Sequence, residues 1–120
     1  MRDHRKLRAF ELTDELAIMI YRITRNFPKS EMYGLTSQMR RAAVSVPSNI
    51  VEGCARASQT EYLRFLEIAF ASLRELHYQF SLAVRLEYLT GHESTISFEA
   101  KITETEKVLA ALIRYLRCSR

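Results

Sequence analysis

The sequence predicts an all-α protein with the architecture of an up-down-up-down antiparallel four-helix bundle, and three observations support this. Four segments repeat apolar residues at the three- and four-residue spacing of a helix face. Only 3 Gly and 2 Pro occur among 120 residues, too few for the turns of a β-sandwich or barrel. Pro28, Gly34 and Gly91 fall between the four segments. A chain of this length supports one core, so we expect residues 1–120 to form a single domain.

The first helix is predicted over residues 8–26. Pro28 ends it, because proline lacks a backbone N–H and clashes with the preceding turn. Its apolar face is formed by Leu12, Leu16, Met19, Ile23 and Phe27.

The second helix is predicted over residues 36–55, with Thr36 or Ser37 as N-cap. Pro47 lies inside it, removes one hydrogen bond and crowds the carbonyl of Ala43, so we expect a kink there. The apolar register continues through the proline, which favours one continuous helix. Its apolar face is formed by Leu35, Met39, Ala43, Val46, Ile50 and Cys54.

The third helix is predicted over residues 59–90 and has the clearest pattern. Ser58 and Glu61 form a capping box at its start, and Gly91 is expected to end it. Alternating steps of four and three residues make a heptad seam, which favours near-parallel packing against long partner helices. The seam consists of Tyr62, Leu66, Ala69, Leu73, Leu76, Phe80 and Ala83.

A second apolar row on the same segment, Leu63, Phe70 and Val84, lies beside the seam, and Phe65 and Ile68 extend the apolar character further. A helix that is apolar over so much of its circumference must bury more than one face. Packing between subunits explains this economically, and a wide stripe within one subunit is the alternative.

The fourth helix is predicted over residues 96–117, with Ser94 or Ser97 before it. Arg114 and Arg117 suit the negative end of its dipole. Its apolar face is formed by Ile102, Thr105, Leu109, Leu112 and Leu116.

Residue patterns for catalysis are missing from the sequence. His4, His77 and His92 do not stand in a metal-binding spacing, and the single glycines form no phosphate-binding loop. Cys54 is expected to be inert packing, and Cys118 has no base placed near it. The carboxylates are spread along solvated faces. We therefore expect no enzyme, no catalytic residues, no cofactor and no metal.

The location that the sequence predicts is the cytoplasm. The N-terminal segment MRDHRKLRAF is charged and lacks the apolar run of a secretory signal. The sequence has no stretch near the roughly 18 consecutive apolar residues of a membrane span, so no membrane partner is expected.

The positive charge is unevenly distributed. The formal net charge is +4, and all of it belongs to residues 1–60, since the later half holds as many acidic as basic residues. Basic clusters of this kind contact phosphates of RNA or DNA, or they only keep a protein soluble. The candidate nucleic-acid-binding residues are Arg2, Arg5, Lys6, Arg8, Arg40 and Arg41.

Three stretches resemble the four-helix-bundle family of 23S rRNA intervening sequences. They are FPKSEMYGL over residues 27–35, LTSQMRRAAVSVPSNIVEG over residues 35–53, and EYLRFLEIAFASLREL over residues 61–76. The resemblance implies a small bacterial bundle that assembles as a homopentamer and has no assigned catalytic residues. A related branch, the accessory protein of diversity-generating retroelements, binds nucleic acid through basic surface. By resemblance, Arg40 and Arg41 contact phosphate or form an ion pair between subunits.

Two functions are compatible with these observations. The first is a non-enzymatic, oligomeric bundle that binds RNA through basic surface in its first half. The second is an interaction or scaffold module whose partner is another protein, in which the basic residues only maintain solubility.

Overall fold

Four long helices make up the computed structural model, which describes residues 2–119. No strand occurs among these residues, so the predicted all-α class is confirmed. The helices are α1 (Arg8–Ile23), α2 (Leu35–Cys54), α3 (Gln59–Arg85) and α4 (His92–Cys118), and the 3-10 helices are η1 (His4–Lys6), η2 (Thr24–Asn26) and η3 (Lys29–Glu31).

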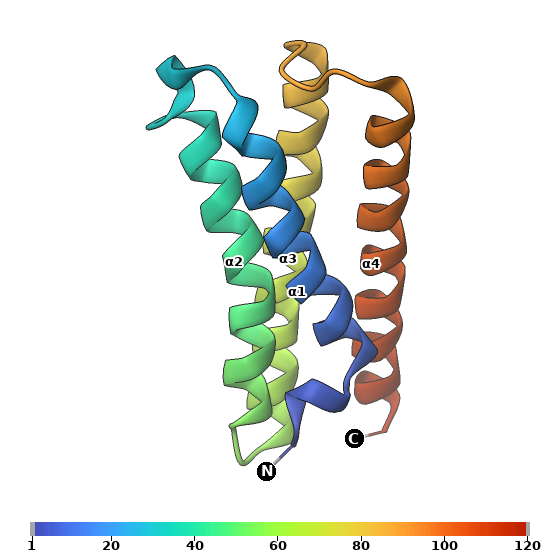
Figure 1. Ribbon diagram of the computed structural model, residues 1–120. Helices are drawn as coiled ribbons and strands as arrows, with labels where there is room; N and C mark the ends of the chain where they lie inside the picture. The colour runs from blue at the N-terminus through green and yellow to red at the C-terminus, as the bar shows by residue number, and fades with distance from the viewer. Residues whose placement is uncertain (1, 120) are drawn as a thin grey trace.

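The four helices lie side by side, and successive helices run in opposite directions (Figure 1). Each packs against the next and α4 packs back against α1, which closes the predicted bundle; α2 and α3 form the most extensive pair. The molecule is 45 Å long. Both ends of the chain lie at the same end of the bundle as the turn between α2 and α3 (Figure 1).

The heptad seam of α3 supplies the centre of the core. All seven residues predicted for it are buried, and Leu66, Leu73 and Leu76 have no exposed surface. The stacked rings of Phe80 and Phe98 continue the core into α4, with 5.0 Å between their centroids. The heptad seam predicted from the periodicity is therefore confirmed.

The predicted apolar face of α2 is buried except for Leu35, which is half-buried. The helix is continuous through Pro47, as the unbroken register predicted. In the turn after the proline, the Asn49 amide donates to the carbonyl and the hydroxyl oxygens of Ser45, at 2.8 and 3.1 Å. Ser45 in turn hydrogen bonds to Ser72 of α3 at 2.9 Å. These polar contacts join α2 to α3 beside the buried proline.

The second apolar row of α3 packs within the same chain. Leu63 is buried, and Phe70 and Val84 are half-buried against the core. A wide stripe inside one subunit therefore accounts for these three residues. Ile68 is different, since 40% of it is exposed.

The connection between α3 and α4 differs from its prediction. The third helix ends at Arg85 rather than residue 90, because Glu87 adopts a left-handed φ of 62° and the Tyr88 N–H bonds back to the Ala83 carbonyl. The fourth helix begins at His92 rather than residue 96. Gly91, with φ of 100°, caps its start and does not end α3, since its carbonyl accepts from the Thr95 N–H at 3.1 Å.

The start of α2 is capped from outside the helix. The helix begins at Leu35, one residue before its prediction, and neither Thr36 nor Ser37 is the cap. The Glu31 carboxylate accepts from the Leu35 N–H at 3.0 Å and from the Tyr88 hydroxyl at 2.7 Å. This carboxylate thus ties the α1–α2 connection to the α3–α4 connection.

We expect this tie to depend on pH. The Leu35 N–H and then the Tyr88 hydroxyl lower the pKa of Glu31, because both stabilise the ionised carboxylate. A lowered pKa in the folded state stabilises the protein above the unfolded pKa, about 4.3, and this contribution disappears as pH falls through the folded value. Glu31→Gln should therefore melt below the wild type at pH 7, and the difference should shrink below about pH 4. A constant difference from pH 7 to pH 3 would contradict this account.

Candidate nucleic-acid interface

The six basic residues predicted to bind nucleic acid lie at two levels of the bundle. Arg2, Arg5 and Lys6 belong to the arm before α1, at the end where the chain termini lie. Arg40 and Arg41 lie in the first turns of α2, and the arm contacts the other end of this helix. At 1.5 Å per residue, about 20 Å separates Arg41 from the end of α2. The six residues therefore do not form one site.

The arm is held against the end of α2. The Arg2 backbone N–H donates to the Cys54 carbonyl at 3.3 Å, and its guanidinium donates to the Arg56 carbonyl at 2.9 Å. Arg5 pairs with Asp3 at 3.0 Å and lowers the pKa of that carboxyl group through its hydrogen bonds. Lys6 is exposed and pairs with no carboxylate within residues 2–119.

Arg8 lies at the start of α1, beyond the arm. It pairs with Glu104 of α4 at 3.1 Å, and both side chains are more than half exposed. Such an exposed pair contributes little to stability.

Arg40 caps the end of α1. Its Nε donates to the Thr24 hydroxyl at 2.9 Å, its Nη2 donates to the Tyr21 carbonyl at 3.4 Å, and the guanidinium lies over the Tyr21 ring. A cation at the negative end of a helix, with these contacts, stabilises the α1–α2 corner. The Arg40 guanidinium is thus engaged within the chain.

We expect Arg40→Ala to lower the free energy of unfolding by about 1–2 kcal/mol, since both the cap and its hydrogen bonds are lost. The free energy of unfolding of Arg40→Lys should lie between those of the wild type and Arg40→Ala, because an ammonium keeps the charge but not the planar guanidinium. The neighbouring Arg41→Ala is the control, with an effect of about 0.5 kcal/mol or less for its exposed ion pair. Chemical denaturation measures all three, and equal losses for Arg40→Ala and Arg41→Ala would refute the capping role.

Arg41 joins α2 to α3. It pairs with Glu75 at 2.5 Å and also donates to the Gln38 side chain, while Gln79 donates to the same carboxylate. The stretch of residues 35–53, which carries the family resemblance, thus contacts both α1 and α3 within the bundle. Even its last residue, Gly53, packs closely: a Cβ there would lie 2.9 Å from the Cβ of Phe65.

Further basic residues join the arm at its end of the bundle. Arg56 lies in the turn after α2, Arg64 in the second turn of α3, and Arg114 and Arg117 near the end of α4. We call the following set the basic end: Arg2, Arg5, Lys6, Arg56, Arg64, Arg114 and Arg117. The carboxylates at the same end belong to Asp3, Glu52, Glu61 and Glu67.

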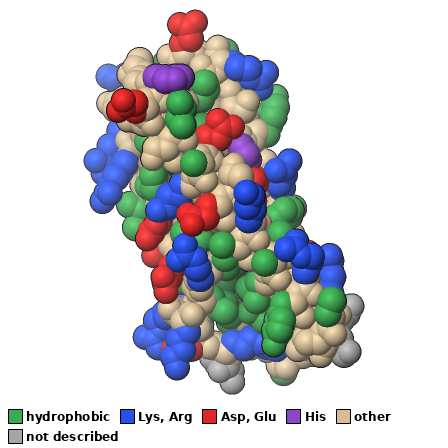
Figure 2. All heavy atoms as spheres, turned by 90° about the vertical axis from the view of Figure 1, so that its right-hand side faces the viewer, with side chains coloured by type: hydrophobic (Ala, Val, Ile, Leu, Met, Phe, Trp, Pro, Cys, Tyr) green, Lys and Arg blue, Asp and Glu red, His purple; other side chains and the backbone are tan. Residues whose placement is uncertain are grey.

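Cations therefore outnumber carboxylates at the basic end, and two carboxylates there are already occupied. Asp3 pairs with Arg5, and Glu67 pairs with Arg117. Figure 2 shows Lys and Arg side chains around the lower end, whereas red and blue alternate further up. The sequence did not predict Arg56, Arg64, Arg114 and Arg117 as binding residues, because they lie far apart in the chain and come together only in the fold.

One cysteine and one histidine make contacts inside the bundle, whereas Cys118 and His92 are exposed. Cys54 is buried, and burial raises the pKa of its thiol; burial also raises the pKa of the adjacent Tyr62 to about 12. His77 lies between two carboxylates of α4, with Nδ1 2.9 Å from Glu106 and Nε2 3.6 Å from Glu99. Within residues 2–119, no group of three or more His, Cys, Asp or Glu could hold a metal ion.

Glu106 departs from its prediction. The sequence placed the carboxylates on solvated faces, but Glu106 is only 8% exposed. It accepts hydrogen bonds from Arg74 at 3.0 Å and from His77, both on α3. These partners compensate its burial and link α3 to α4.

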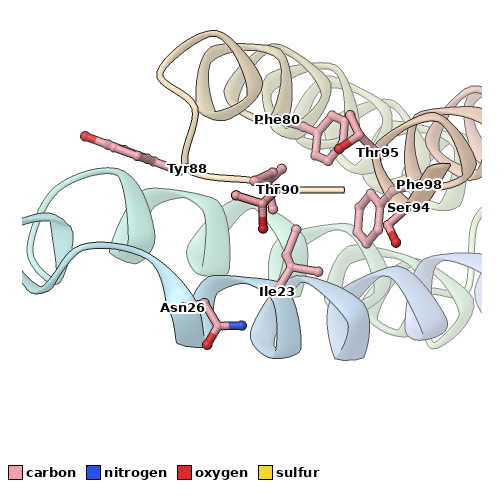
Figure 3. A pocket seen from close by; sticks show the side chains of 9 residues that line it. Ile23, Asn26, Phe80, Tyr88, Thr90, Ser94, Thr95 and Phe98 are labelled. Atoms are coloured by element: carbon pink, nitrogen blue, oxygen red, sulfur yellow. The ribbon is translucent and has the colours of Figure 1, made fainter. Parts of the chain in front are cut away.

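A cavity of about 240 Å³ lies at the opposite end of the bundle, near the α3–α4 connection. Figure 3 shows Ile23, Phe80 and Phe98 beside Thr90 of that connection and Ser94 and Thr95 of α4, while the Tyr88 side chain extends away from them. No charged side chain lines the cavity, and the Tyr88 hydroxyl is bound to Glu31. The Ser and Thr hydroxyls that line the cavity therefore have no charged side chain beside them in its lining.

The fold and these surfaces define a small helical-bundle protein with one basic end. The chain belongs to the family of 23S rRNA-intervening sequence proteins, whose family model matches residues 5–111. A solved structure from Bacteroides thetaiotaomicron, described as a protein of unknown function from the S23 ribosomal protein family, is similar to it. The two share 25% sequence identity over 88% of this chain and 95% of that one, with a TM-score of 0.79. No curated protein matches the sequence.

No helix within the described residues is both long and apolar enough to cross a membrane.

Proposed function

We propose that this protein binds RNA without catalysing a reaction, and that the basic end is its contact surface. The observation that carries the proposal is the gathering of cations from the arm, the α2–α3 turn, α3 and α4 at one end of the bundle. Such a surface neutralises phosphates and releases counterions, which makes binding strong at low salt. RNA is the favoured nucleic acid because the family takes its name from inserts in 23S rRNA.

The candidate residues contribute unequally to this proposal. Lys6, Arg56 and Arg64 are exposed and pair with no carboxylate in the described part of the chain. Arg2 lies beside them, and Arg5 adds to the surface while it also pairs with Asp3, which partly neutralises its charge. Arg8 and Arg41 must each leave a carboxylate to reach a phosphate, and Arg40 must leave the end of α1. We therefore expect these last three to contribute less.

A gel-shift titration with 23S rRNA fragments at 50 and 200 mM salt tests the proposal. Each phosphate contact contributes roughly 0.7 to 0.9 to the slope of log affinity against log salt. A surface with about five contacts should therefore lose roughly 100- to 500-fold in affinity over this range. Absence of binding at 50 mM salt would overturn the proposal.

Assembly into a homo-oligomer, a pentamer by family resemblance, is the second part of the proposal. Val44 and Val51 of α2 and Ile68 of α3 are each more than a third exposed. The Ser45–Ser72 contact sets the register of these helices and places Ile68 at a level between the two valines. Exposed apolar side chains at one level of neighbouring helices are candidates for a subunit interface. Light scattering should give several times the monomer mass of 14.0 kDa, and a monomer at micromolar concentration would overturn this part.

A protein-binding scaffold is the alternative, and a groove between α3 and α4 supports it. Phe70, Ala110 and Ile113 line this groove, of about 420 Å³, with Arg114 and Arg117 at its edge. Apolar floors with charged rims accept amphipathic segments of other proteins. Pull-down from the native host with and without nuclease separates the two functions, because a protein partner would stay bound after the RNA is digested.

A further inference from the structure

Two arginines at the α2–α3 turn lie on aromatic rings of α3. The guanidinium carbon of Arg2 is 4.1 Å from the centroid of the Tyr62 ring, and that of Arg56 is 4.8 Å from the centroid of the Phe65 ring. Tyr62 and Phe65 are three residues apart, so they share one side of α3. Each guanidinium therefore has one face packed on a ring.

The Arg2 guanidinium is held in place before any ligand arrives, and that of Arg56 lies over the Phe65 ring. The Arg2 guanidinium donates to the Arg56 carbonyl at 2.9 Å, and Tyr62 beneath it is only 3% exposed. Gly53 lets α2 approach the two aromatic side chains closely, since a Cβ there would lie 2.9 Å from Phe65 and 3.2 Å from Tyr62. Groups fixed in this way lose little conformational entropy when they bind.

An open hollow lies beside these arginines. It has a volume of about 550 Å³ and is lined by Arg2, Ala55, Arg56 and Ala57. The two alanines leave room above the turn, and no carboxylate lines the hollow. Asp3, the acidic residue next to Arg2, is engaged by Arg5.

We propose that the Arg2–Arg56 hollow binds unpaired bases of single-stranded RNA, which stack on the guanidinium planes while Arg5 and Lys6 contact the adjacent phosphates. This inference rests on the proposed RNA binding and names the form of RNA that the site takes. Arginine planes and aromatic rings stack on unpaired bases, and every base has a face to offer. A duplex keeps its base faces inside the stack, so the hollow favours single strands.

The test compares charge with stacking at one position. Arg56→Lys keeps the positive charge and removes the plane. Fluorescence anisotropy with a labelled ten-nucleotide single-stranded RNA should show an affinity loss of about tenfold, the lower range for one stacked base. Binding of a duplex RNA of the same length should change less than about twofold, because its phosphate contacts remain.

A matched control lies at the other end of α3. Arg85 is exposed, and its guanidinium carbon is 5.9 Å from the centroid of the Tyr78 ring. Arg85→Lys should leave single-strand binding unchanged. A second variant, Ala57→Leu, fills the hollow without changing charge and should also weaken only the single strand. Melting curves check that each variant folds like the wild type.

Each outcome supports or overturns a defined step. Retained single-strand affinity in both Arg56→Lys and Ala57→Leu, with wild-type binding intact, would overturn the stacking site and leave the proposed RNA binding standing. Equal losses on single strand and duplex would also overturn it. If a polyglutamate peptide displaced the labelled single strand as well as unlabelled RNA does, the site would recognise charge rather than a base, and the stacking proposal would be overturned. Absence of wild-type binding to any RNA would overturn the proposed function itself.

Discussion

Gly53→Val should lower the free energy of unfolding by about 3 kcal/mol, the upper range for overpacking a closely packed contact. A Cβ at this position would lie 2.9 Å from the Cβ of Phe65 and 3.2 Å from the backbone carbonyl oxygen of Tyr62. Neither atom is the tip of a flexible side chain, so α2 and α3 must separate. Replacing a glycine inside a helix by the β-branched valine gains roughly 0.4 kcal/mol in propensity, which offsets only a small part of the cost.

Chemical denaturation of two further variants separates crowding from propensity. Gly53→Ala gains most in helix propensity and adds one carbon, so its loss should be smaller than that of Gly53→Val. Ser48→Val, on the exposed side of the same helix, should change stability by about 0.5 kcal/mol or less. If Gly53→Val were as stable as Ser48→Val, the close approach of the two helices would be refuted.

A functional loss should accompany the loss of stability. Tyr62 and Phe65, which a side chain at Gly53 would displace, are the rings under Arg2 and Arg56. Gly53→Val protein that is still folded at low temperature should therefore bind single-stranded RNA less well than the wild type. Gly53, the last residue of the stretch that resembles the family, thus links the packing of the bundle to the geometry of its basic end.

Periodicity predicted the bundle well, because burial follows helix geometry directly. The seam from Tyr62 to Ala83 is buried throughout, and the face of α2 continues through Pro47 as the register indicated. In α4, Ile113 is buried and the predicted Leu112 is half-buried, which is a shift of one position on the same side.

The ends of the helices were predicted less well, because contacts between distant residues decide them. Glycine is common just after a helix end, so the sequence predicted that Gly91 ends α3. The helix ends at Arg85 instead, and Tyr88 in the following connection donates to the Glu31 carboxylate. The cap of α2 likewise comes from Glu31 rather than from Thr36 or Ser37. These partners lie far apart in sequence, and local preferences do not reveal them.

The basic end was predicted only in part for the same reason. The net charge predicted a binding surface within residues 1–60, and Arg40 and Arg41 were included because they are adjacent in sequence. In the fold, Arg40 caps α1 and Arg41 pairs with Glu75. The half of the chain with zero net charge supplies Arg64, Arg114 and Arg117, because its carboxylates are spread along the bundle.

The double substitution Lys6→Glu and Arg64→Glu should weaken RNA binding by about 100-fold at 50 mM salt, which corresponds to about 2.7 kcal/mol. Each change removes a phosphate contact and adds a repelled charge, so the salt slope should also fall by about 2. Both side chains are exposed, and neither pairs with a carboxylate within the described residues, so the melting temperature should change little.

A double variant with the same change in net charge, Arg22→Glu and Lys29→Glu, is the control. Both residues are exposed and lie at the opposite end of the bundle, in α1 and η3. Since salt screens charges over about 10 Å at 0.1 M and the bundle is 45 Å long, this variant should retain affinity within about threefold. Equal losses in the two double variants would mean that total charge rather than the basic end attracts the RNA. A loss confined to Lys6→Glu and Arg64→Glu would support phosphate contact at that end.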